Sequence, residues 1–272
     1  MPSIPELPSE AKILALVRKV LFPKGVKCCH CKCWNIKKLS TEGRYYCRRC
    51  RKKFSLKSSH PLLFRMRISW QEFYALLWLW QNKYQPGQTK QLTGLSHVAV
   101  ERWFSRFRLY LPAFDEYPPL ADMVEVDESQ FGHAYNFTDQ WVAGAISRTS
   151  RQIRLQPITN RDSGCLDRFL IKYIKRDSLV ITDAYSAYYG IERFHGFVHE
   201  VANHSNGNFG PTAHAENIWS RCDRFIIRVY HQVQKHRLKN ILLELQARFS
   251  IPEIFTSPQS YLQFALARVP LS

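Results

Sequence analysis

Two stretches in the first half of the chain carry apolar residues at helical spacing, and they predict two helices joined by a short turn. The first helix is expected from residue 70 to about residue 83 after a capping Ser69, and Pro86-Gly87 ends it. The second is expected to start near Ser96, just after Thr93-Gly94. The two apolar stripes are Phe73, Leu76, Leu77 and Trp80, and Val100, Trp103, Phe104 and Phe107. A glycine in a short turn between helices is typical of a helix-turn-helix module.

Three arginines lie outside the second apolar stripe, at Arg102, Arg106 and Arg108. On an exposed face they would enter the major groove of DNA as a recognition helix does. A small helical bundle with a solvated basic face fits the same pattern, so the pattern alone leaves both interpretations open. Residues 112–119 contain three prolines and are predicted to link this module to the second half of the chain.

The second half of the chain changes to short runs rich in Val and Ile, which predict strands. Three runs, at 123–131, 140–146 and 152–158, predict an antiparallel meander. A helix at 163–175 and short strands at 179–181 and 197–201 are expected next. Two amphipathic helices then follow, and their apolar stripes are Ala215, Trp219, Cys222, Ile226 and Val229, and Leu238, Ile241, Leu242, Leu245 and Phe249. This order of strands, then alternating strand and helix, then two long helices predicts an α/β domain with a mixed sheet.

Positive charge is concentrated in the first part of the chain. Residues 1–120 hold 22 Lys and Arg against 7 Asp and Glu, and the remainder holds 17 against 15. A basic region joined to a near-neutral one is typical of a nucleic-acid grip attached to a separate working domain. The longest dense apolar run, 73–80, is too short to span a bilayer, and no basic-then-apolar leader opens the sequence. We therefore expect an intracellular protein on DNA, with no membrane partner, in the bacterial cytoplasm or in a eukaryotic nucleus.

Six of the eight cysteines lie close together, which is not the spread of a disulfide framework. Two Cys-x2-Cys pairs separated by fifteen residues have the spacing of a zinc ribbon. The predicted ligands of one structural Zn²⁺ ion are Cys28, Cys31, Cys47 and Cys50. Alternative ligands remain open within or beside the first pair: Cys29, His30 and Cys33. The cations within and just after the second cysteine pair would surround the metal and are expected to contact DNA phosphates; they are Arg48, Arg49, Arg51, Lys52 and Lys53.

Three acidic residues in the second half stand in contexts that indicate a metal site. Asp127 lies within the first predicted strand, Asp183 follows a later strand, and Glu216 opens a predicted helix. Hard divalent cations take oxygen ligands, so carboxylates on rigid elements are what a two-metal phosphoryl-transfer site requires. Each acid also has a simpler explanation: an exposed strand face beside Glu125 and Glu128, a turn, or a favourable charge at a helix start. Their occurrence together behind a basic region favours the metal site.

Three segments and their order resemble the DDE transposases of bacterial insertion sequences and the related Merlin-type eukaryotic elements. The segments are VEVDESQFG at 124–132, ITDAYSAY at 181–188 and AENIWS at 215–220. The resemblance covers roughly residues 20–250 and implies a ribonuclease H-like catalytic domain with Asp127, Asp183 and Glu216 as its catalytic acids. Asn203-His204-Ser205 also looks like the Asn-His-Ser stretch of that family.

The resemblance implies in-line attack on a phosphodiester, with two Mg²⁺ (or Mn²⁺) ions held by the three acids. Cleavage would free the ends of the element, and the freed 3'-hydroxyls would join target DNA. The partner is then double-stranded DNA, and bringing two ends together requires at least a homodimer. Phosphates would be positioned by His204, Arg221, Arg224 and Arg228, although a solvated helix face also accounts for the three arginines.

One position departs from the family. Many relatives carry a Lys two helical turns after the catalytic Glu, where this chain has Asp223 between Arg221 and Arg224. Either an arginine takes over the phosphate contact, or the added negative charge raises the pKa of a neighbouring carboxylate when metal is absent.

The predicted fold is therefore α/β, a ribonuclease H-like mixed sheet with helices, preceded by a small zinc ribbon and a helix-turn-helix module. The expected boundaries are 1–60 for the N-terminal segment and ribbon, 61–115 for the helix-turn-helix, 120–250 for the catalytic domain and 251–272 for a C-terminal tail. Two other functions fit the same features: a DNA-binding regulator descended from a transposase, and a ribonuclease H-like nuclease that cuts without joining.

Overall fold

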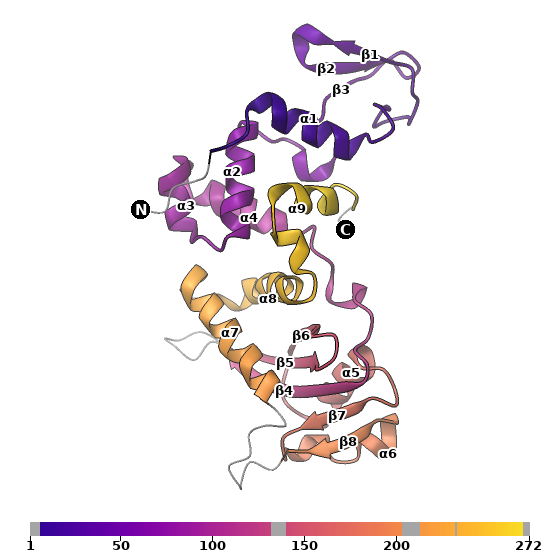
Figure 1. Cartoon of the computed structure of the whole chain (residues 1–272), viewed down its shortest axis with the longest axis vertical. Helices are drawn as coiled ribbons and strands as arrows, with labels where there is room; N and C mark the ends of the chain where they lie inside the picture. The colour runs from indigo at the N-terminus through magenta and orange to yellow at the C-terminus, as the bar shows by residue number, and fades with distance from the viewer. Residues whose placement is uncertain (1–5, 132–139, 203–212, 232, 269–272) are drawn as a thin grey trace. The chain divides into compact units, whose positions relative to one another are not determined.

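The computed structural model describes residues 6–131, 140–202, 213–231 and 233–268. The chain forms two compact units, one made of Met1–Tyr110 together with Glu253–Ser272, and the other of Leu111–Pro252. Figure 1 shows the elements of both units along the chain. Among the described residues, no helix has the length and apolar character needed to cross a membrane.

The first unit begins with α1 (Glu10–Leu21), which Ser9 caps, and continues into a three-stranded antiparallel sheet. The strands are β1 (Ile36–Leu39), β2 (Arg44–Cys47) and β3 (Lys53–Phe54), in that order across the sheet. This small sheet is the predicted ribbon, because Cys28 and Cys31 precede its first strand, Cys47 ends its central strand and Cys50 lies in the turn before β3.

Three helices follow the ribbon. They are α2 (Trp70–Gln81), α3 (Pro86–Thr93) and α4 (His97–Arg108). Ser69 caps α2 as predicted, since its hydroxyl accepts a hydrogen bond from the Glu72 amide at 3.0 Å and the Glu72 carboxylate accepts one from the Ser69 amide. The prediction of a helix break at Pro86 is confirmed, but Pro86 also starts α3, because a first helical residue needs no N–H donor.

The turn between α3 and α4 contains Gly94, which has a φ of 70°. This left-handed conformation strains most other residues, so glycine ends α3 at low cost and redirects the chain into α4. Ser96 caps α4 through the Ala99 amide. The two predicted stripes lie on α2 and α4, and the turn at Gly94 joins α4 to the additional helix α3, which the stripes do not predict.

The end of the chain returns to the first unit instead of forming a separate tail. Its helix α9 (Pro258–Ala265) places the Tyr261 hydroxyl 2.7 Å from the Phe107 carbonyl, to which it donates. The Gln81 side-chain amide donates to the carbonyls of Ile254 and Ser257 at 2.9 and 2.8 Å. These bonds connect residues more than 150 positions apart, which is why the sequence pattern does not indicate them.

The second unit is built on a five-stranded mixed sheet in the order β6-β5-β4-β7-β8. The strands are β4 (Met123–Phe131), β5 (Gln140–Ser147), β6 (Ile153–Ile158), β7 (Leu179–Thr182) and β8 (Val198–Val201). The first three strands pair antiparallel, which confirms the predicted meander, whereas β7 pairs parallel with β4 and β8 with β7. The fold class is the predicted ribonuclease H-like mixed sheet.

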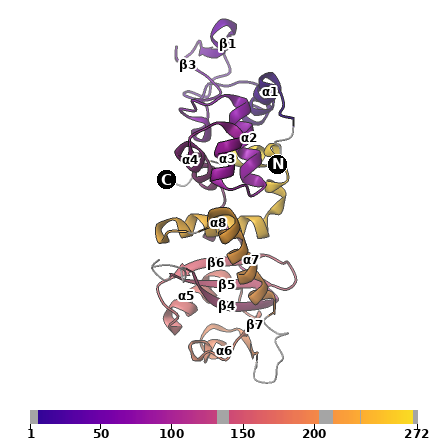
Figure 2. The ribbon, with the colours of Figure 1, turned by 90° about the vertical axis from the view of Figure 1, so that its left-hand side faces the viewer.

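Helices cover the sheet on both sides, as Figures 1 and 2 show for α5 (Ser163–Tyr173) and α7 (Ala213–Tyr230). A shorter helix, α6 (Ile191–His195), precedes β8, and α8 (Lys235–Ser250) follows α7. The side-chain oxygens of Gln246 and Ser250 on α8 accept hydrogen bonds from the Leu155 and Ile153 amides of β6. The outer edge of β6 is thereby covered, which protects it from pairing with another chain.

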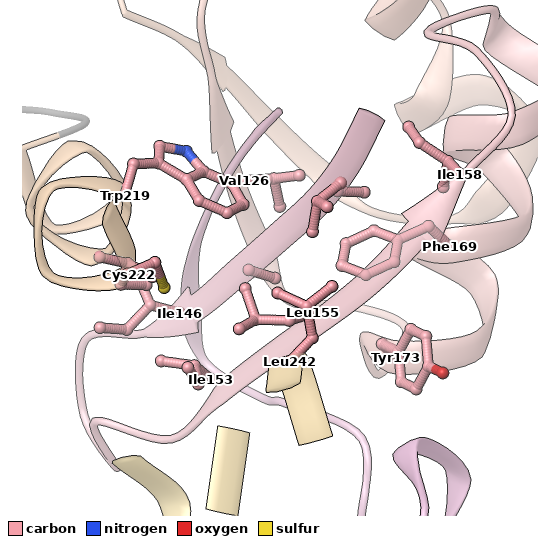
Figure 3. Close-up of a cluster of buried hydrophobic side chains, with 14 of the residues drawn as sticks. Val126, Ile146, Ile153, Leu155, Ile158, Phe169, Tyr173, Trp219, Cys222 and Leu242 are labelled. Carbon is pink, nitrogen blue, oxygen red and sulfur yellow. The ribbon is translucent and has the colours of Figure 1, made fainter. Parts of the chain in front are cut away.

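The core of the second unit forms between the sheet and these helices. Figure 3 shows Val126, Leu155, Phe169, Trp219 and Leu242 within it, contributed by β4, β6, α5, α7 and α8. Four of these side chains are at most 3% exposed, and Trp219 is 7% exposed. Trp219 keeps its indole at the margin of this core, which places it beside the acidic residues of β4.

Candidate active site and zinc site

The zinc ribbon gathers the four predicted cysteines around one point. The sulfur atoms of Cys28, Cys31, Cys47 and Cys50 all lie within 4.8 Å of one another. The Sγ atoms of Cys28 and Cys50 are 3.6 Å apart, and those of Cys31 and Cys47 are 3.5 Å apart. Tetrahedral Zn–S bonds of about 2.3 Å place sulfurs about 3.8 Å apart, so the four thiols fit one Zn²⁺ ion.

The two cysteine pairs have the same backbone geometry. In each, the residue after the second cysteine is left-handed, with φ of 58° at Lys32 and 57° at Arg51, and its amide donates to the carbonyl of the pair's first cysteine. Hydrogen bonds, that from the Cys50 amide first among them, lower the pKa of the Cys47 thiol to about 6, whereas burial and the neighbouring thiols raise the pKa values of Cys31 and Cys50. The alternative ligands lie outside the four-sulfur group: Cys29, His30 and Cys33.

Asp127 is held at the middle of β4 by the helix that carries Glu216. The Trp219 indole N–H of α7 donates to Asp127 Oδ2 at 3.0 Å, and the Glu128 amide donates to Oδ1 at 2.8 Å. Burial, together with the nearby charges of Asp183 and Glu216, raises the pKa of Asp127 to about 6 despite these bonds. Asp183 and Glu216 therefore both lie within electrostatic reach of Asp127.

Trp219 can reach Asp127 because β5 has a glycine where the indole crosses it. Gly144 pairs with Asp127 across the sheet, and a Cβ on Gly144 would lie 2.5 Å from Trp219 Cη2. No real Cβ contact is that short, so a larger residue would displace the indole. Gly144 is thus a requirement of the site that the sequence analysis did not identify.

Asp183 immediately follows β7, whose last residue, Thr182, is fully buried. The Tyr185 amide donates to Asp183 Oδ1 at 3.1 Å, which fixes the carboxylate against the turn that follows the strand. Glu216 lies in the first turn of α7 and is exposed. The third acid therefore depends on the placement of α7 itself.

A fourth acid, Glu125, anchors the start of α7 to the sheet. Its carboxylate is completely buried and accepts hydrogen bonds from the amides of His214 and Ala215 at 2.8 and 2.9 Å. It also accepts from His214 Nδ1 at 2.7 Å and from Arg148 Nε at 2.5 Å. Glu125 does not lie on an exposed strand face, because α7 covers the face of β4 that Glu125 shares with Asp127. The only indication in the sequence is that Glu125 and Asp127 are two residues apart on one strand, which places their side chains on the same face of the sheet.

Glu128 lies on the opposite face of β4 and also contributes to the site. The buried Tyr188 hydroxyl donates to Glu128 Oε1 at 2.9 Å. Burial raises the pKa of Glu128 to about 7, and the charges of Asp127 and Asp183 act in the same direction. In the sequence, Glu128 is recognisable only as a neighbour of Asp127.

The predicted DNA-contacting cations of the ribbon lie on its surface, and Lys53 forms an ion pair with Glu42 at 2.9 Å. Arg102 on α4 is exposed as predicted. Arg106 instead donates to the carbonyls of Pro61 and Phe64, and its guanidinium stacks on Trp103. These contacts direct the Arg106 guanidinium into the first unit.

The prediction that Arg108 faces solvent is wrong, because this residue is only 7% exposed. Arg108 is one turn after Phe104, and residues four apart share a helix face, so it continues the buried stripe. The Val100 to Phe107 stripe is therefore wider than the pattern of apolar residues indicates.

The three arginines of α7 are exposed along one side of the helix. Arg221 stacks on Phe249 with 4.2 Å between guanidinium carbon and ring centre, and Arg224 Nε donates to the Ser220 carbonyl. Asp223 is also exposed, and the partial burial of its carboxylate raises its own pKa. The neighbouring charges that raise the pKa of Asp127 are those of Asp183 and Glu216. His204 lies outside the described residues, as does the rest of its Asn-His-Ser stretch.

The chemistry of the three acids fits a hard divalent cation, since every donor is a carboxylate oxygen. Within the described parts of the chain, the four cysteines are the only group of three or more possible ligands whose donor atoms all lie within 4.8 Å. The donor atoms of the three carboxylates therefore do not all lie within 4.8 Å of one another.

Two parts of the chain match known protein families. Residues 119–250 match the ISXO2-like transposase domain, and residues 8–53 match the transposase zinc-ribbon domain; together they span about two thirds of the chain. A search of curated proteins finds no match. Among solved structures, a chain in the cryo-EM structure of the simian T-cell lymphotropic virus intasome in complex with PP2A regulatory subunit B56 gamma is 12% identical, and the match covers 60% of this chain and 68% of that one. Its TM-score of 0.35 is too low to bear on function.

Proposed function

This chain belongs to the transposases that combine an ISXO2-like domain with an N-terminal zinc ribbon, and we propose that it binds transposon ends, cleaves phosphodiester bonds there and joins the 3'-hydroxyl ends to target DNA. The observation that carries the proposal is the bond from Trp219 to Asp127, at 3.0 Å. It couples the strand that bears the first acid to the helix that bears Glu216, with Asp183 beside them.

We assign Asp127, Asp183 and Glu216 as the ligands of two Mg²⁺ or Mn²⁺ ions. Such ions, when bound, activate the attacking oxygen and stabilise the leaving oxygen of an in-line displacement. The protein's part is to orient the three carboxylates: Trp219 orients Asp127, the Tyr185 amide orients Asp183, and Glu125 fixes the helix start from which Glu216 extends. Because Asp127 and Glu128 have raised pKa values, ion binding would displace protons from this cluster near neutral pH.

DNA contact is proposed along the exposed cations of both units. In the first unit these are Arg48, Arg49, Arg51, Lys52, Lys53 and Arg102. In the second they are Arg221, Arg224 and Arg228, joined by His204. Phosphate contacts of this kind fix register on the duplex and carry no base sequence. We also propose a homodimer or larger assembly on DNA, because transposition brings two ends together.

A joining assay separates this function from its two alternatives. The purified protein is given a precleaved duplex end with a free 3'-hydroxyl, a target plasmid and Mg²⁺. Joined products support the transposase, cleavage without joining supports a nuclease, and binding without either reaction supports a regulator. The Asp127→Ala variant is expected to bind DNA nearly as the wild type does and to give no product; joining by this variant would refute the assignment of the acids.

A further inference from the structure

Arg161 occupies an unusual position at the edge of the acidic site. It lies in the connection between β6 and α5, and its guanidinium stands between two aromatic rings. The guanidinium carbon is 4.4 Å from the centre of the Trp141 ring and 4.6 Å from that of Tyr185. Both rings pack against the hydrophobic core, so they hold the guanidinium in place from two sides.

The hydrogen-bonding capacity of Arg161 is not used by the parts of the chain that the structure describes. A guanidinium carries five N–H donors in one plane, and in that described portion no atom accepts a hydrogen bond or forms an ion pair with them. The two rings contact the guanidinium without accepting hydrogen bonds from its N–H groups. An arginine ordered by stacking loses little side-chain entropy when it then binds an anion.

Arg161 is connected to the acidic site through Tyr185 and Glu128. Tyr185, which stacks on Arg161, donates its backbone amide to Asp183 Oδ1. Trp141 pairs in the sheet with Gln130 and therefore lies on the face of β4 that carries Glu128. The positive charge of Arg161 also acts on Glu128, whose pKa it lowers against the stronger effect of burial. A DNA strand entering the site meets several carboxylates, and a fixed cation beside them offsets the repulsion of its phosphates.

We propose that Arg161, held between Trp141 and Tyr185, binds a backbone phosphate of the DNA strand that enters the catalytic site. This inference rests on the proposed function for the location of that strand, and it adds a positioning residue that the sequence motifs do not include. A planar guanidinium matches two phosphate oxygens at once, which fixes the strand's direction as well as its distance from the acids.

The competing explanation is that Arg161 only balances the charge of Glu128. The two explanations differ in the salt dependence of DNA binding. Each phosphate contact releases counterions, so the plot of log affinity against log salt concentration steepens by about 0.9 per contact. A residue that acts only inside the protein changes the affinity without changing that slope.

The test measures binding of a short fluorescent DNA duplex to the full chain by anisotropy over a range of salt concentrations. Ca²⁺ replaces Mg²⁺ in the buffer. Ca²⁺ also binds carboxylate oxygens, but it accepts a less regular arrangement of ligands than Mg²⁺ does. The variants are Arg161→Gln, which removes the charge, and Arg161→Lys, which keeps it without the planar fork. The matched control is Arg176→Gln, which removes an exposed arginine just before the amino end of β7, away from the end that bears Asp183.

We expect Arg161→Gln to weaken binding about tenfold at low salt and to reduce the slope by about 0.9, with the slope of Arg176→Gln unchanged. Arg161→Lys should keep the slope and bind about threefold more weakly than the wild type, because a point charge replaces bidentate contact. A wild-type slope for Arg161→Gln, in a variant whose circular dichroism and melting match the wild type, overturns the proposal. Failure of the wild type to join DNA, with the slope change intact, would count against the proposed reaction and leave this contact standing.

Discussion

Removing the Glu125 carboxylate tests how the third acid is positioned. Glu125→Ala leaves two backbone N–H groups at the start of α7 without their acceptor, and it removes the partner of Arg148 and His214. Loss of a helix cap costs about 0.5–2 kcal/mol, and breaking a buried ion pair costs about 3–5 kcal/mol. The side chains of Arg148 and His214 are 27% and 36% exposed, so water replaces part of the second loss. We expect α7 to lose about 3 kcal/mol of stability.

Glu125→Gln separates the helix anchor from the ion pair. The remaining carbonyl oxygen of the glutamine can accept from the His214 and Ala215 amides, while its NH₂ group faces the Arg148 donor. The helix start should then be retained and the Arg148 bond lost, at a cost of about 1–3 kcal/mol. The expected order of α7 stability is wild type, then Glu125→Gln, then Glu125→Ala.

Hydrogen–deuterium exchange is the assay, because amides of α7 report on that helix while the rest of the chain serves as an internal reference. A loss of about 3 kcal/mol corresponds to roughly a hundredfold or more lower protection. Mn²⁺ affinity should fall with it in Glu125→Ala, since Glu216 extends from the loosened turn. The control is Glu200→Gln, an exposed glutamate of β8, which should change stability by less than about 0.5 kcal/mol. The reasoning is refuted if α7 of Glu125→Ala exchanges as slowly as in that control.

Three further predictions follow from the site. Gly144→Ala should displace the Trp219 indole, lower thermal stability by about 1–3 kcal/mol and weaken Mn²⁺ binding; an unchanged melting temperature and affinity would contradict the close approach of Trp219 to this glycine. Cys47→Ser, or zinc chelation, should unfold the ribbon and weaken binding of transposon ends, as followed by zinc release and DNA titration, and unchanged affinity at physiological salt would exclude that role. Burial raises the pKa of Asp127 to about 6 and of Glu128 to about 7, above the values in the unfolded chain, so the metal-free native state holds extra protons between about pH 4 and pH 7. These two groups should therefore favour the native state more as the pH falls through that window, while Mn²⁺ affinity measured by calorimetry declines below about pH 6; affinity independent of pH would contradict the shifts.

Features that depend on local sequence are predicted well. The spacing of the two cysteine pairs indicates four thiols that the structure brings within 4.8 Å of one another. The strand over residues 123–131 and the helix after Ser69 have the expected limits to within two residues at each end, because alternation and capping are local signals. The α3 helix is missed because Pro86, interpreted as the break after the preceding helix, is the first residue of α3, while α2 already ends at Gln81.

Features that depend on distant partners are not predicted. In the sequence Glu125 is only one more acid on a strand. Its role depends on the start of α7, about ninety residues later, whose amides it accepts hydrogen bonds from. The hydrogen bond from Trp219 to Asp127 joins residues 92 positions apart in the sequence, and it also requires Gly144 on a third element, β5. Arg108 carries a charge that suggests a surface position, yet its place one turn after Phe104 buries it. In each case packing between elements decides what the local pattern cannot.

The most direct measurement of the central claim is a crystal structure of the protein soaked with Mn²⁺, with the ions located by anomalous scattering. The account predicts one or two ions bound by Asp127, Asp183 and Glu216, with the Trp219 indole still donating to Asp127 and the three carboxylates closer together than without metal. Ions bound elsewhere, or a Glu216 carboxylate directed away from an ion held by the two aspartates, would contradict it.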